Sequence, residues 1–531
     1  MRDHEISFDA SKTPAEPVFA PVFNAAVHFV DRHLNEGRAE KTVIRSVEGD
    51  VTYGELAENV NRCGNLLRRL GIGRGERVVM VIKDCPEFFY VFWGAIKIGA
   101  IPVAINTLWR AKDYQYVLED SECAAVIYSP EYASELEPAL AAAAHVLAHA
   151  IPVDGGGDTL AVQMAAEPVS LEAAATAADD PCFFMYSSGS TGSPKGVVHS
   201  HSAPVAVSHY FGAGALGITE NDIVFSAAKL FFAYGLGNAL CFPLWTGGQS
   251  VLFSGRPTAE TAFETIEAFQ PTVYFGVPTL YAAQLQAMEN TVRDLGSVRT
   301  FVSAGEVLPP RIFESWKEKT GRSILDGIGS TELLNTFISN RADAVKPGTS
   351  GLPVPGYDAR IAGDDGAEVP QGETGTLMVR GMSQFKRYWN KPEKTSETIV
   401  DGWINTGDTY YEDEDGYFVC CGRSDDMLKV GGIWCSPVEI EARLVEHPAV
   451  LEAAIVGRPD PSDLIKPEAF VVLKDGGKPS NGLADELLQF CKSGLAPYKY
   501  PRWFNFVEEL PRTATGKVQR FRLREQQGAQ S

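Results

Sequence analysis

The sequence predicts an α/β protein with a large N-terminal domain of parallel-type sheets and a small C-terminal α+β domain. Strand, helix and strand follow one another near the start, and the alternation recurs to about residue 303. After Arg423 the pattern changes to short helices and strands that suit a separate small domain. We therefore predict two domains, residues 1–423 and 424–531.

The first elements form a unit in which a helix packs on parallel strands. Thr52 and Glu55 have the spacing of a capping box, and apolar residues follow them at helical intervals. A buried strand over 77–83, a helix over 86–100 and a strand over 101–105 come next. This spacing predicts a βαβ unit, in which the two strands run parallel.

The later elements follow from the same patterns. In the large domain we expect strands over 124–128, 272–275 and 300–303, a helix over the alanine-rich 132–150, and a loop over 153–160. In the small domain we expect a helix beginning near Ser436, strands over 451–456, 469–473 and 503–507, and a helix over 483–493.

Composition narrows the class of protein. The 531 residues include 47 Lys and Arg against 68 Asp and Glu, a formal charge of −21 that argues against nucleic acid as a partner. The start lacks the apolar core of a secretory signal, and the longest apolar stretch, 230–245, is too short to cross a membrane. The nine cysteines have neither disulfide nor zinc spacing, so we expect reduced thiols and a cytoplasmic protein.

The strongest local signal is the segment YSSGSTGSPKG over 186–196, between two apolar runs. Its glycines permit tight turns, and its hydroxyls, backbone N–H groups and Lys195 suit an anion, so the segment predicts a phosphate-binding loop. It is not the loop of P-loop ATPases, because G-x-x-x-x-G-K-[ST] is absent. His199 and His201 follow at H-x-H spacing, and we interpret both as structural rather than as metal ligands.

This loop resembles the signature loop of the adenylate-forming superfamily, which comprises acyl-CoA synthetases, luciferases and peptide-synthetase adenylation domains. Five further segments resemble motifs of that superfamily in order: SAGE (303–306), GSTE (329–332), WINTGD (403–408), GRSDDMLKVGG (422–432) and PRTATGK (511–517). The matches extend from about residue 50 to residue 520. A non-catalytic nucleotide-binding protein is disfavoured, because Glu332 and Lys517 are both present.

The resemblance implies an enzyme that uses ATP, Mg²⁺ and coenzyme A. Thr331 would contact phosphate, Glu332 would hold Mg²⁺, and Lys517 would stabilise the adenylation step. These charges would screen the repulsion between a carboxylate and the phosphates that it approaches. The nucleotide-binding set implied is Ser187, Ser188, Gly189, Ser190, Thr191, Lys195, Ala304, Gly305, Glu306, Asp326, Gly327, Ile328, Ser330, Asp408 and Arg423.

The resemblance also implies a mobile C-terminal domain. Asp425 would be the pivot, because the domain that carries Lys517 must move to admit a thiol after adenylation. The residues implied near the pantetheine arm are Lys429, Gly431, Gly432 and Trp434, and a plain glycine hairpin is the other interpretation of 431–432. Acetylation of Lys517 would remove its charge, so a lysine acetyltransferase or deacetylase is a further predicted partner. A second copy of the chain, in a homodimer, is another.

Within the superfamily, long blocks resemble the benzoate-CoA ligase group. They lie at 225–240, 327–334, 429–441 and 495–503, and they favour an aryl acid over a fatty acid. The expected acid pocket is Phe231, Ala233, Tyr234, Gly235, Ala304, Ile328, Gly329 and Asn335, with Phe232 as a further aromatic candidate. Core packing is the other interpretation of Phe231 and Phe232.

One position departs from that group. Asn335 stands where its benzoate ligases carry His, and it either fills space or pairs with a polar substituent on the ring. Benzoate, 2-aminobenzoate and hydroxybenzoate therefore stay open as substrates. The acceptor is predicted to be free CoA, and the alternative is an adenylation enzyme that loads an aryl acid onto a carrier protein's phosphopantetheine.

Overall fold

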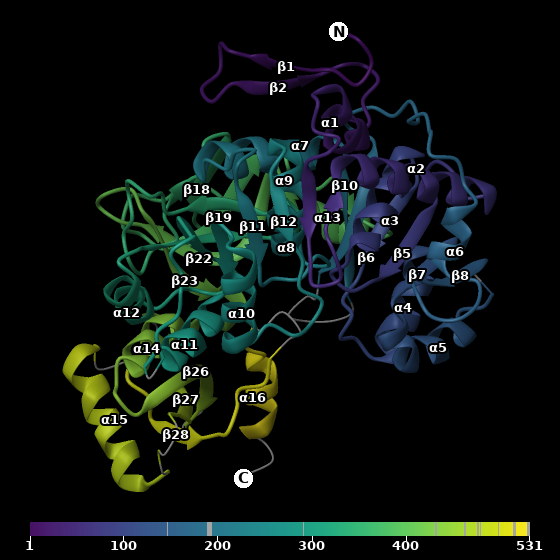
Figure 1. The fold of residues 1–531 in the computed structure, drawn as a ribbon. Helices are drawn as coiled ribbons and strands as arrows, with labels where there is room; N and C mark the ends of the chain where they lie inside the picture. The colour runs from purple at the N-terminus through teal and green to yellow at the C-terminus, as the bar shows by residue number, and fades with distance from the viewer. Residues whose placement is uncertain are drawn as a thin grey trace.

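The structure is a computed structural model, and it describes residues 1–145, 147–187, 194–289, 291–430, 433–460, 464–474, 477, 479–496, 499–512 and 517–527. Figure 1 shows a large body that contains both N-terminal sheets, with the C-terminal elements gathered on one side of it. A hairpin of β1 (Ile6–Asp9) and β2 (Glu16–Phe19) projects from the opposite side.

The first large sheet contains the predicted βαβ unit. Its seven strands run in the order β20-β10-β9-β6-β5-β7-β8. Their bounds are β5 Arg77–Val81, β6 Ile101–Ala104, β7 Ala125–Tyr128, β8 His149–Pro152, β9 Pro181–Ser187, β10 Lys195–Ser200 and β20 Arg387–Tyr388. Strand β5 pairs in parallel with β6, and α3 (Pro86–Lys97) connects them. The capping box is also confirmed, because Thr52 and Glu55 cap α2 (Tyr53–Arg69) reciprocally.

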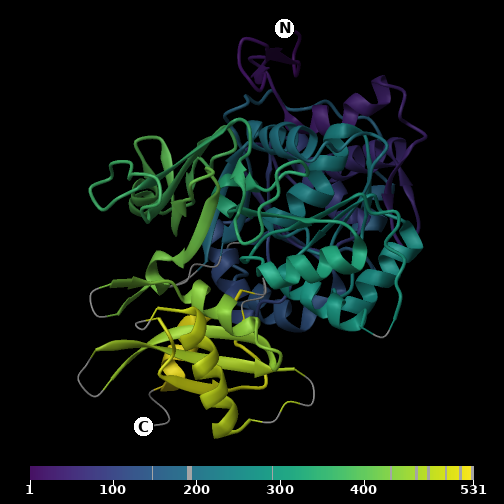
Figure 2. The same cartoon turned by 90° about the vertical axis from the view of Figure 1, so that its left-hand side faces the viewer.

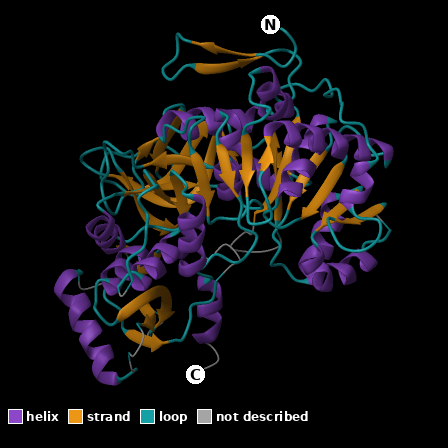
Figure 3. Cartoon of the chain, viewed as in Figure 1, coloured by secondary structure: helices purple, strands orange, loops and turns teal. Residues whose placement is uncertain are grey.

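The second sheet lies beside the first, and helices cover both (Figure 3). Its nine strands run in the order β17-β16-β15-β14-β13-β11-β12-β3-β4. Their bounds are β3 Thr42–Arg45, β4 Val51–Thr52, β11 Ile223–Ser226, β12 Gln249–Val251, β13 Val273–Gly276, β14 Thr300–Ser303, β15 Ile324–Gly329, β16 Thr336–Ser339 and β17 Leu352–Pro353. The parallel pairs β13–β14 and β14–β15 bring three chain segments to one edge, where the predicted site residues follow the strands.

One sequence-based expectation is wrong in its extent. The helix predicted over 132–150 is α5 (Ala133–Ala142), and residues 149–152 form β8 instead. Strand β8 pairs in parallel with β7 and completes the edge of the first sheet, which is a tertiary contact that overrides the helix propensity of alanine. Helix α4 (Ala111–Ser121), which packs against α5, was not predicted.

A third sheet, of five strands, leads into the C-terminal elements. Its strands are β18 Tyr357–Ala362, β19 Gly375–Gly381, β21 Ile399–Val400, β22 Trp403–Glu412 and β23 Phe418–Arg423. The short helix η6 (Ser424–Asp426) follows β23 directly.

The C-terminal elements have a core of their own (Figure 2). Strands β26 (Val450–Pro459), β27 (Ile465–Leu473) and β28 (Trp503–Phe506) form one sheet, and β24 (Leu428–Val430) pairs with β25 (Ile433–Cys435). The helices are α14 Pro437–Val445, α15 Asn481–Gly494 and α16 Arg520–Gln527. The predicted α+β pattern is therefore confirmed, and the core of this unit begins at Leu428, just after η6.

A nearly continuous helical run crosses the large body from the expected acid pocket. It consists of α8 (Ala233–Gly235), the π-helical η4 (Leu236–Cys241) and α9 (Phe242–Thr246). The remaining helices are η1 Val27–Asp31, α1 Arg32–Asn35, η2 Pro130–Tyr132, α6 Leu160–Ala165, α7 Ser202–Val207, η3 Ser208–Ala215, α10 Ala259–Phe269, α11 Pro278–Ala287, α12 Pro310–Thr320, η5 Thr331–Leu333 and α13 Pro392–Thr398.

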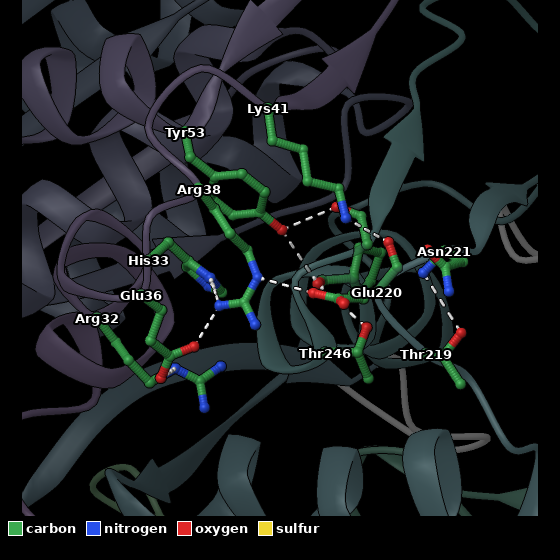
Figure 4. Close-up of polar contacts among 12 residues, drawn as sticks. Arg32, His33, Glu36, Arg38, Lys41, Tyr53, Thr219, Glu220, Asn221 and Thr246 are labelled. Atoms are coloured by element: carbon green, nitrogen blue, oxygen red, sulfur yellow. Dashed lines mark hydrogen bonds and ion pairs between the residues drawn. The ribbon is translucent and has the colours of Figure 1, made fainter.

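Side chains from the N-terminal helices cap the far end of that helical run, and Figure 4 draws three of them, Arg32, His33 and Tyr53, together with Thr246 of the run. His33 Nε2 donates to the Leu244 carbonyl at 2.7 Å, Tyr53 Oη donates to the Gly248 carbonyl at 2.8 Å, and Arg32 donates to the Trp245 carbonyl. A helix end buried without such donors would leave its last carbonyls unsatisfied. The caps therefore fix the run at its far end.

Two further findings concern membrane-spanning helices and the cysteines. Among the helices that the structure describes, none combines the length and the apolar character needed to cross a membrane. Eight of the nine cysteines are buried as free thiols, and Cys420 is half-buried.

Candidate active site

The stem of the phosphate loop is an antiparallel hairpin. Strands β9 and β10 pair from Lys195 opposite Ser187 onwards, so both residues lie at the mouth of the loop. Ser188, Gly189, Ser190 and Thr191 lie outside the described residues. The space around Gly196 is tight, since a Cβ there would lie 3.2 Å from the Cβ of Trp389 and 3.3 Å from the ring of Phe184.

A carboxylate holds the stem in place. Tyr186, the residue before Ser187, donates its hydroxyl to Asp120 Oδ2 at 2.6 Å. Trp389 Nε1 donates to the Asp120 carbonyl at 2.9 Å, and the Trp389 N–H donates to the Gly196 carbonyl at 2.7 Å. Both strands of the hairpin are thus tied to neighbouring elements close to where the loop begins.

The second nucleotide motif lies on a short helix after β15. Ser330 caps η5, and its Oγ accepts from the Leu333 N–H at 3.3 Å. The Thr331 carbonyl lies 2.8 Å from His199 Nε2, which must donate because a carbonyl only accepts. The Phe385 N–H donates to the Glu332 carbonyl at 2.7 Å. These donors fix the main chain at Thr331 and Glu332.

His199 and His201 are both neutral. Burial lowers the pKa of His199 to about 4 and that of His201 to about 3. His201 Nδ1 accepts from the Ala25 N–H at 3.2 Å, and His199 supports the second motif as described. Each histidine therefore has a contact that supports the interpretation of both as structural residues.

A tyrosine joins the phosphate loop to the second motif. Tyr388, on β20 beside β10, is buried and donates its hydroxyl to Glu332 Oε1 at 2.7 Å. The ammonium group of Lys195 lies 5.0 Å from the centre of the Tyr388 ring. Burial lowers the pKa of Lys195, and the charge of Glu332 opposes that effect. Three separate elements therefore bring a cation, a phenol and a carboxylate together.

An ion pair between adjacent strands forms the next part of the site. Asp408 on β22 pairs with Arg423 on β23, and Arg423 Nη1 lies 3.1 Å from Asp408 Oδ1. Burial raises the pKa of Asp408, while the charges of Arg423 and Lys517 oppose the rise. Lys517 is exposed on its own unit, yet it lies near enough to act on this carboxylate.

Glu306 connects the two units. It follows β14 and the left-handed Gly305 (φ +98°), and its Oε1 lies 3.1 Å from Arg512 Nη1. Arg512 Nη2 also lies 2.8 Å from Glu452 Oε2 on β26, and the main chain at Arg512 forms an isolated antiparallel β-bridge with that at Val518. Burial raises the pKa of Glu306, and the charge of Arg512 opposes the rise. The side chain expected near the nucleotide thus has a partner in the C-terminal unit.

Aromatic and small residues gather where the acid pocket is expected. Phe231 is buried, and its ring centre lies 4.3 Å from that of Phe232. The ring of Tyr234 meets Phe275 edge to face at 5.9 Å. Ala233 and Ala304 are buried, and Ile328 is half-buried. Phe231 also belongs to the main hydrophobic core, as the alternative interpretation of this residue expects.

Close packing explains the glycines of this region. A Cβ at Gly235 would lie 2.1 Å from the Lys229 carbonyl oxygen, and one at Gly329 would lie 2.6 Å from the Asn335 carbonyl oxygen. At Gly327 a Cβ would lie 2.7 Å from the Ile338 carbonyl oxygen. No real Cβ approaches that closely, so each position is confined to glycine.

Asn335 is buried and hydrogen-bonded within the protein. Its Nδ2 donates to the carbonyls of Ala233 and Tyr234, both at 3.2 Å, and its Oδ1 accepts from the Thr336 N–H at 2.7 Å. These bonds tie the chain after the second motif to the first turn of α8. Gly237 packs directly on the amide, because a Cβ there would lie 2.1 Å from Nδ2.

Asp326 is buried within β15. Its Oδ2 accepts from the Leu308 N–H at 3.3 Å, and burial raises its pKa to about 7. The residue lies opposite Ser303 in the β14–β15 register, and its bond to Leu308 ties it to the chain that follows Glu306.

Three of the predicted hinge and CoA residues, Asp425, Lys429 and Trp434, lie among the described residues. Asp425 is exposed in η6. Lys429 and Trp434 occupy paired positions in the β24–β25 hairpin, and Gly431 and Gly432 lie outside the described residues.

Comparison with known proteins decides the family. Residues 30–389 match the AMP-binding enzyme family, and residues 439–517 match the AMP-binding enzyme C-terminal domain. The chain belongs to this family. As an AMP-binding enzyme it contains the adenylate-forming motifs in order, and the resemblance to the benzoate-CoA ligase group is confirmed.

Relatives of this AMP-binding enzyme are similar along nearly their whole length. A benzoate–CoA ligase of Thauera aromatica is 48% identical, over 97% of this chain and 98% of the relative. A 4-hydroxybenzoate–CoA/benzoate–CoA ligase of Rhodopseudomonas palustris is 45% identical, over 95% and 94%. The crystal structure of an anthranilate CoA ligase in complex with anthranoyl-AMP has a TM-score of 0.92 and 41% identity, over 96% of this chain and 98% of that chain.

Sequence reasoning missed several residues of the site. Tyr388 lies in no predicted motif and is brought to Glu332 only by the pairing of β20 with β10. Asp120 and Arg512 likewise act through contacts that are distant in the sequence. A partial signal existed for Arg512, which lies inside the motif of Lys517.

Proposed function

We propose that this AMP-binding enzyme is an aryl-CoA ligase. It uses ATP and Mg²⁺ to convert a benzoate-type acid into an acyl-adenylate, and it then transfers the acyl group to CoA as a thioester. One observation carries the proposal: Lys195, Tyr388 and Glu332 are assembled beside a group of aromatic and small residues, in a chain similar over its length to benzoate–CoA ligases.

The first half-reaction joins the acid to AMP. A carboxylate oxygen attacks the α-phosphorus of ATP, and the bond to pyrophosphate breaks. Lys195 and Lys517 offset the negative charges that approach one another, and Asp408 accepts hydrogen bonds from the ribose hydroxyls. Arg423 holds Asp408 for this role through the 3.1 Å ion pair.

Glu332 is the residue proposed to hold Mg²⁺. A carboxylate oxygen suits this hard cation, and Tyr388 fixes the orientation of the carboxylate. Among the described residues no three His, Cys, Asp or Glu side chains are grouped as metal ligands. When bound, Mg²⁺ neutralises charge on the phosphate oxygens.

The second half-reaction transfers the acyl group. The CoA thiol attacks the acyl carbon, AMP departs with the bonding electron pair, and the thiol proton is lost to solvent. We propose that the boundary between the domains falls after Arg423 and that Asp425 is the pivot. The end of β23 at Arg423 and the start of the C-terminal core at Leu428 support this boundary. Lys429, Gly431, Gly432 and Trp434 are proposed to line the path of the pantetheine arm.

Benzoate, 2-aminobenzoate and hydroxybenzoate are the proposed substrates. Phe231, Tyr234, Ala304 and Ile328 are proposed to form a flat apolar site for the ring. Of the two roles expected for Asn335, its contacts favour a structural one, because both kinds of polar group on its amide already have partners in the chain.

Further parts of the proposal are a cytoplasmic location, a homodimer, and control by a lysine acetyltransferase or deacetylase that acts on Lys517. The exposed side chain of Lys517 is accessible to such an enzyme, and acetylation would remove its charge. Light scattering on the purified protein tests the dimer, and activity after acetylation of Lys517 tests the control.

The mass of the product tests the proposed function. The protein is incubated with ATP, Mg²⁺ and CoA together with each aryl acid or a long-chain fatty acid, and thioesters are identified by mass spectrometry. We expect an aryl-CoA with at least one benzoate-type acid and none without ATP. A fatty acyl-CoA as the main product contradicts the aryl assignment. A thioester formed only on an added carrier protein would instead support the alternative acceptor.

A further inference from the structure

A buried ion pair binds the chain segment just before Phe231 of the expected acid pocket, and it takes no part in the proposed chemistry. Asp84 follows β5 in the first sheet, and its side chain is 6% exposed. Its Oδ2 lies 3.7 Å from the ammonium nitrogen of Lys229, which belongs to the chain after β11 in the second sheet and is 17% exposed. The pair therefore joins the two sheets at the segment that leads to Phe231.

Asp84 also binds the main chain of that segment. Its Oδ1 accepts from the Leu230 N–H at 3.1 Å, so both carboxylate oxygens contact consecutive residues. Lys229 is held in turn, because its ammonium group donates to the Phe253 carbonyl and lies 5.1 Å from the centre of the Phe253 ring. The carboxylate thus has a fixed position relative to the residue before Phe231.

The turn after Lys229 has little room to move. The Phe232 N–H donates to the Lys229 carbonyl at 3.0 Å, and Gly235 packs against that same carbonyl so closely that no Cβ fits. Leu230 is fully buried between them. A displacement of Lys229 or Leu230 would consequently move Phe231 and the start of α8 together.

Burial disfavours the charged forms of both members of this pair. Burial raises the pKa of Asp84 and lowers that of Lys229, and each charge opposes the shift of the other. Apolar residues of similar volume are often at least as stabilising as a buried ion pair, so stability alone gives a weak account of these two residues. The pair instead fixes the position of the turn, since the carboxylate binds two consecutive residues of it.

We propose that Asp84 is a positioning residue for the acid site: through the Leu230 N–H and Lys229 it fixes the turn that presents Phe231 to the aromatic ring of the substrate. The inference rests on the proposed function, because it concerns the acid site of that reaction. It assigns to Asp84 an effect on the binding of the acid and none on the binding of ATP or CoA.

The test compares three variants by steady-state kinetics, with KM measured separately for benzoate, ATP and CoA. Asp84→Ala removes both contacts, and Asp84→Asn keeps an acceptor for the Leu230 N–H while removing the charge. Lys97→Met is the matched control, because Lys97 is 2% exposed and pairs with Asp31 of η1 at 2.6 Å, at the last residue of α3, whereas Asp84 precedes the first residue of that helix. Thermal unfolding of each variant is recorded so that the assays are made on folded protein.

We expect Asp84→Ala to raise KM for benzoate about tenfold or more, which corresponds to about 1.4 kcal/mol, with KM for ATP and CoA changed less than about twofold. Asp84→Asn should lie between Asp84→Ala and the wild type, and it carries the test if Asp84→Ala does not fold. Lys97→Met should lower the unfolding temperature while leaving KM for benzoate unchanged.

Two results overturn the inference: an unchanged KM for benzoate in both Asp84 variants, or equal increases in KM for all three substrates. Failure of the proposed function looks different, because the wild type itself would then form no aryl-CoA.

Discussion

Removing the hydroxyl of Tyr388 tests whether the carboxylate of Glu332 must be held in one orientation. Tyr388→Phe deletes one oxygen from a buried side chain that donates to Glu332 Oε1 at 2.7 Å. A hydrogen bond to a charged group contributes about 1.5–3 kcal/mol. If that orientation matters in the transition state, kcat/KM for adenylation falls about tenfold to a hundredfold.

The assay is the exchange of labelled pyrophosphate into ATP, which follows adenylation alone, measured over a range of Mg²⁺ concentrations. We expect the half-saturating Mg²⁺ concentration to rise in Tyr388→Phe. Tyr53→Phe is the matched control, since Tyr53 is also buried and donates to a carbonyl at 2.8 Å, but in the cap network of Figure 4. Equal exchange rates and equal Mg²⁺ dependence in the two variants would refute the reasoning.

Four other changes have defined outcomes. Lys517→Ala should slow adenylation far more than thioester formation from supplied acyl-adenylate, and equal losses in the two assays would argue against it. Glu306→Gln should weaken adenylation selectively because it removes the charge of the ion pair between the units. Glu452→Gln, which affects the same arginine within one unit, should not distinguish the two half-reactions. Asn335→Ala should lower kcat/KM for all three aryl acids in parallel, and a loss confined to a substituted acid would restore the role of reading the ring. Burial raises the pKa of Asp326 to about 7, so between about pH 4 and 7 the folded wild type keeps a proton that the unfolded chain loses, and its stability falls as pH rises. The urea midpoint of Asp326→Asn relative to wild type should therefore rise over that range and then level off. A difference that stays constant with pH would contradict this.

Local patterns in the sequence were enough to predict much of the fold. The capping box at Thr52 and the strand–helix–strand spacing that follows depend on neighbouring residues, and both are confirmed. The helix predicted over 132–150 failed where β8 is stabilised by pairing with β7, which is a contact that composition does not encode.

Some residues of the candidate site could likewise be predicted from local sequence motifs, and others could not. The motifs of Lys195, Glu332 and Asp408 carry sequence signatures, and the fold brings these residues near one another. Tyr388 and Asp84 have no such signature, because their contacts are long-range and depend on how the sheets are assembled. Asn335 was predicted as a site residue from its position, but its hydrogen-bond partners could be known only from the structure.

The transfer of a labelled oxygen tests the central claim most directly. Benzoate labelled with ¹⁸O in its carboxylate is incubated with the enzyme, ATP, Mg²⁺ and CoA, and the nucleotide products are analysed by mass spectrometry. Since a carboxylate oxygen attacks the α-phosphorus, the account predicts AMP that carries one labelled oxygen, formed together with benzoyl-CoA. Unlabelled AMP, or ADP with label in the released phosphate, would contradict an acyl-adenylate intermediate.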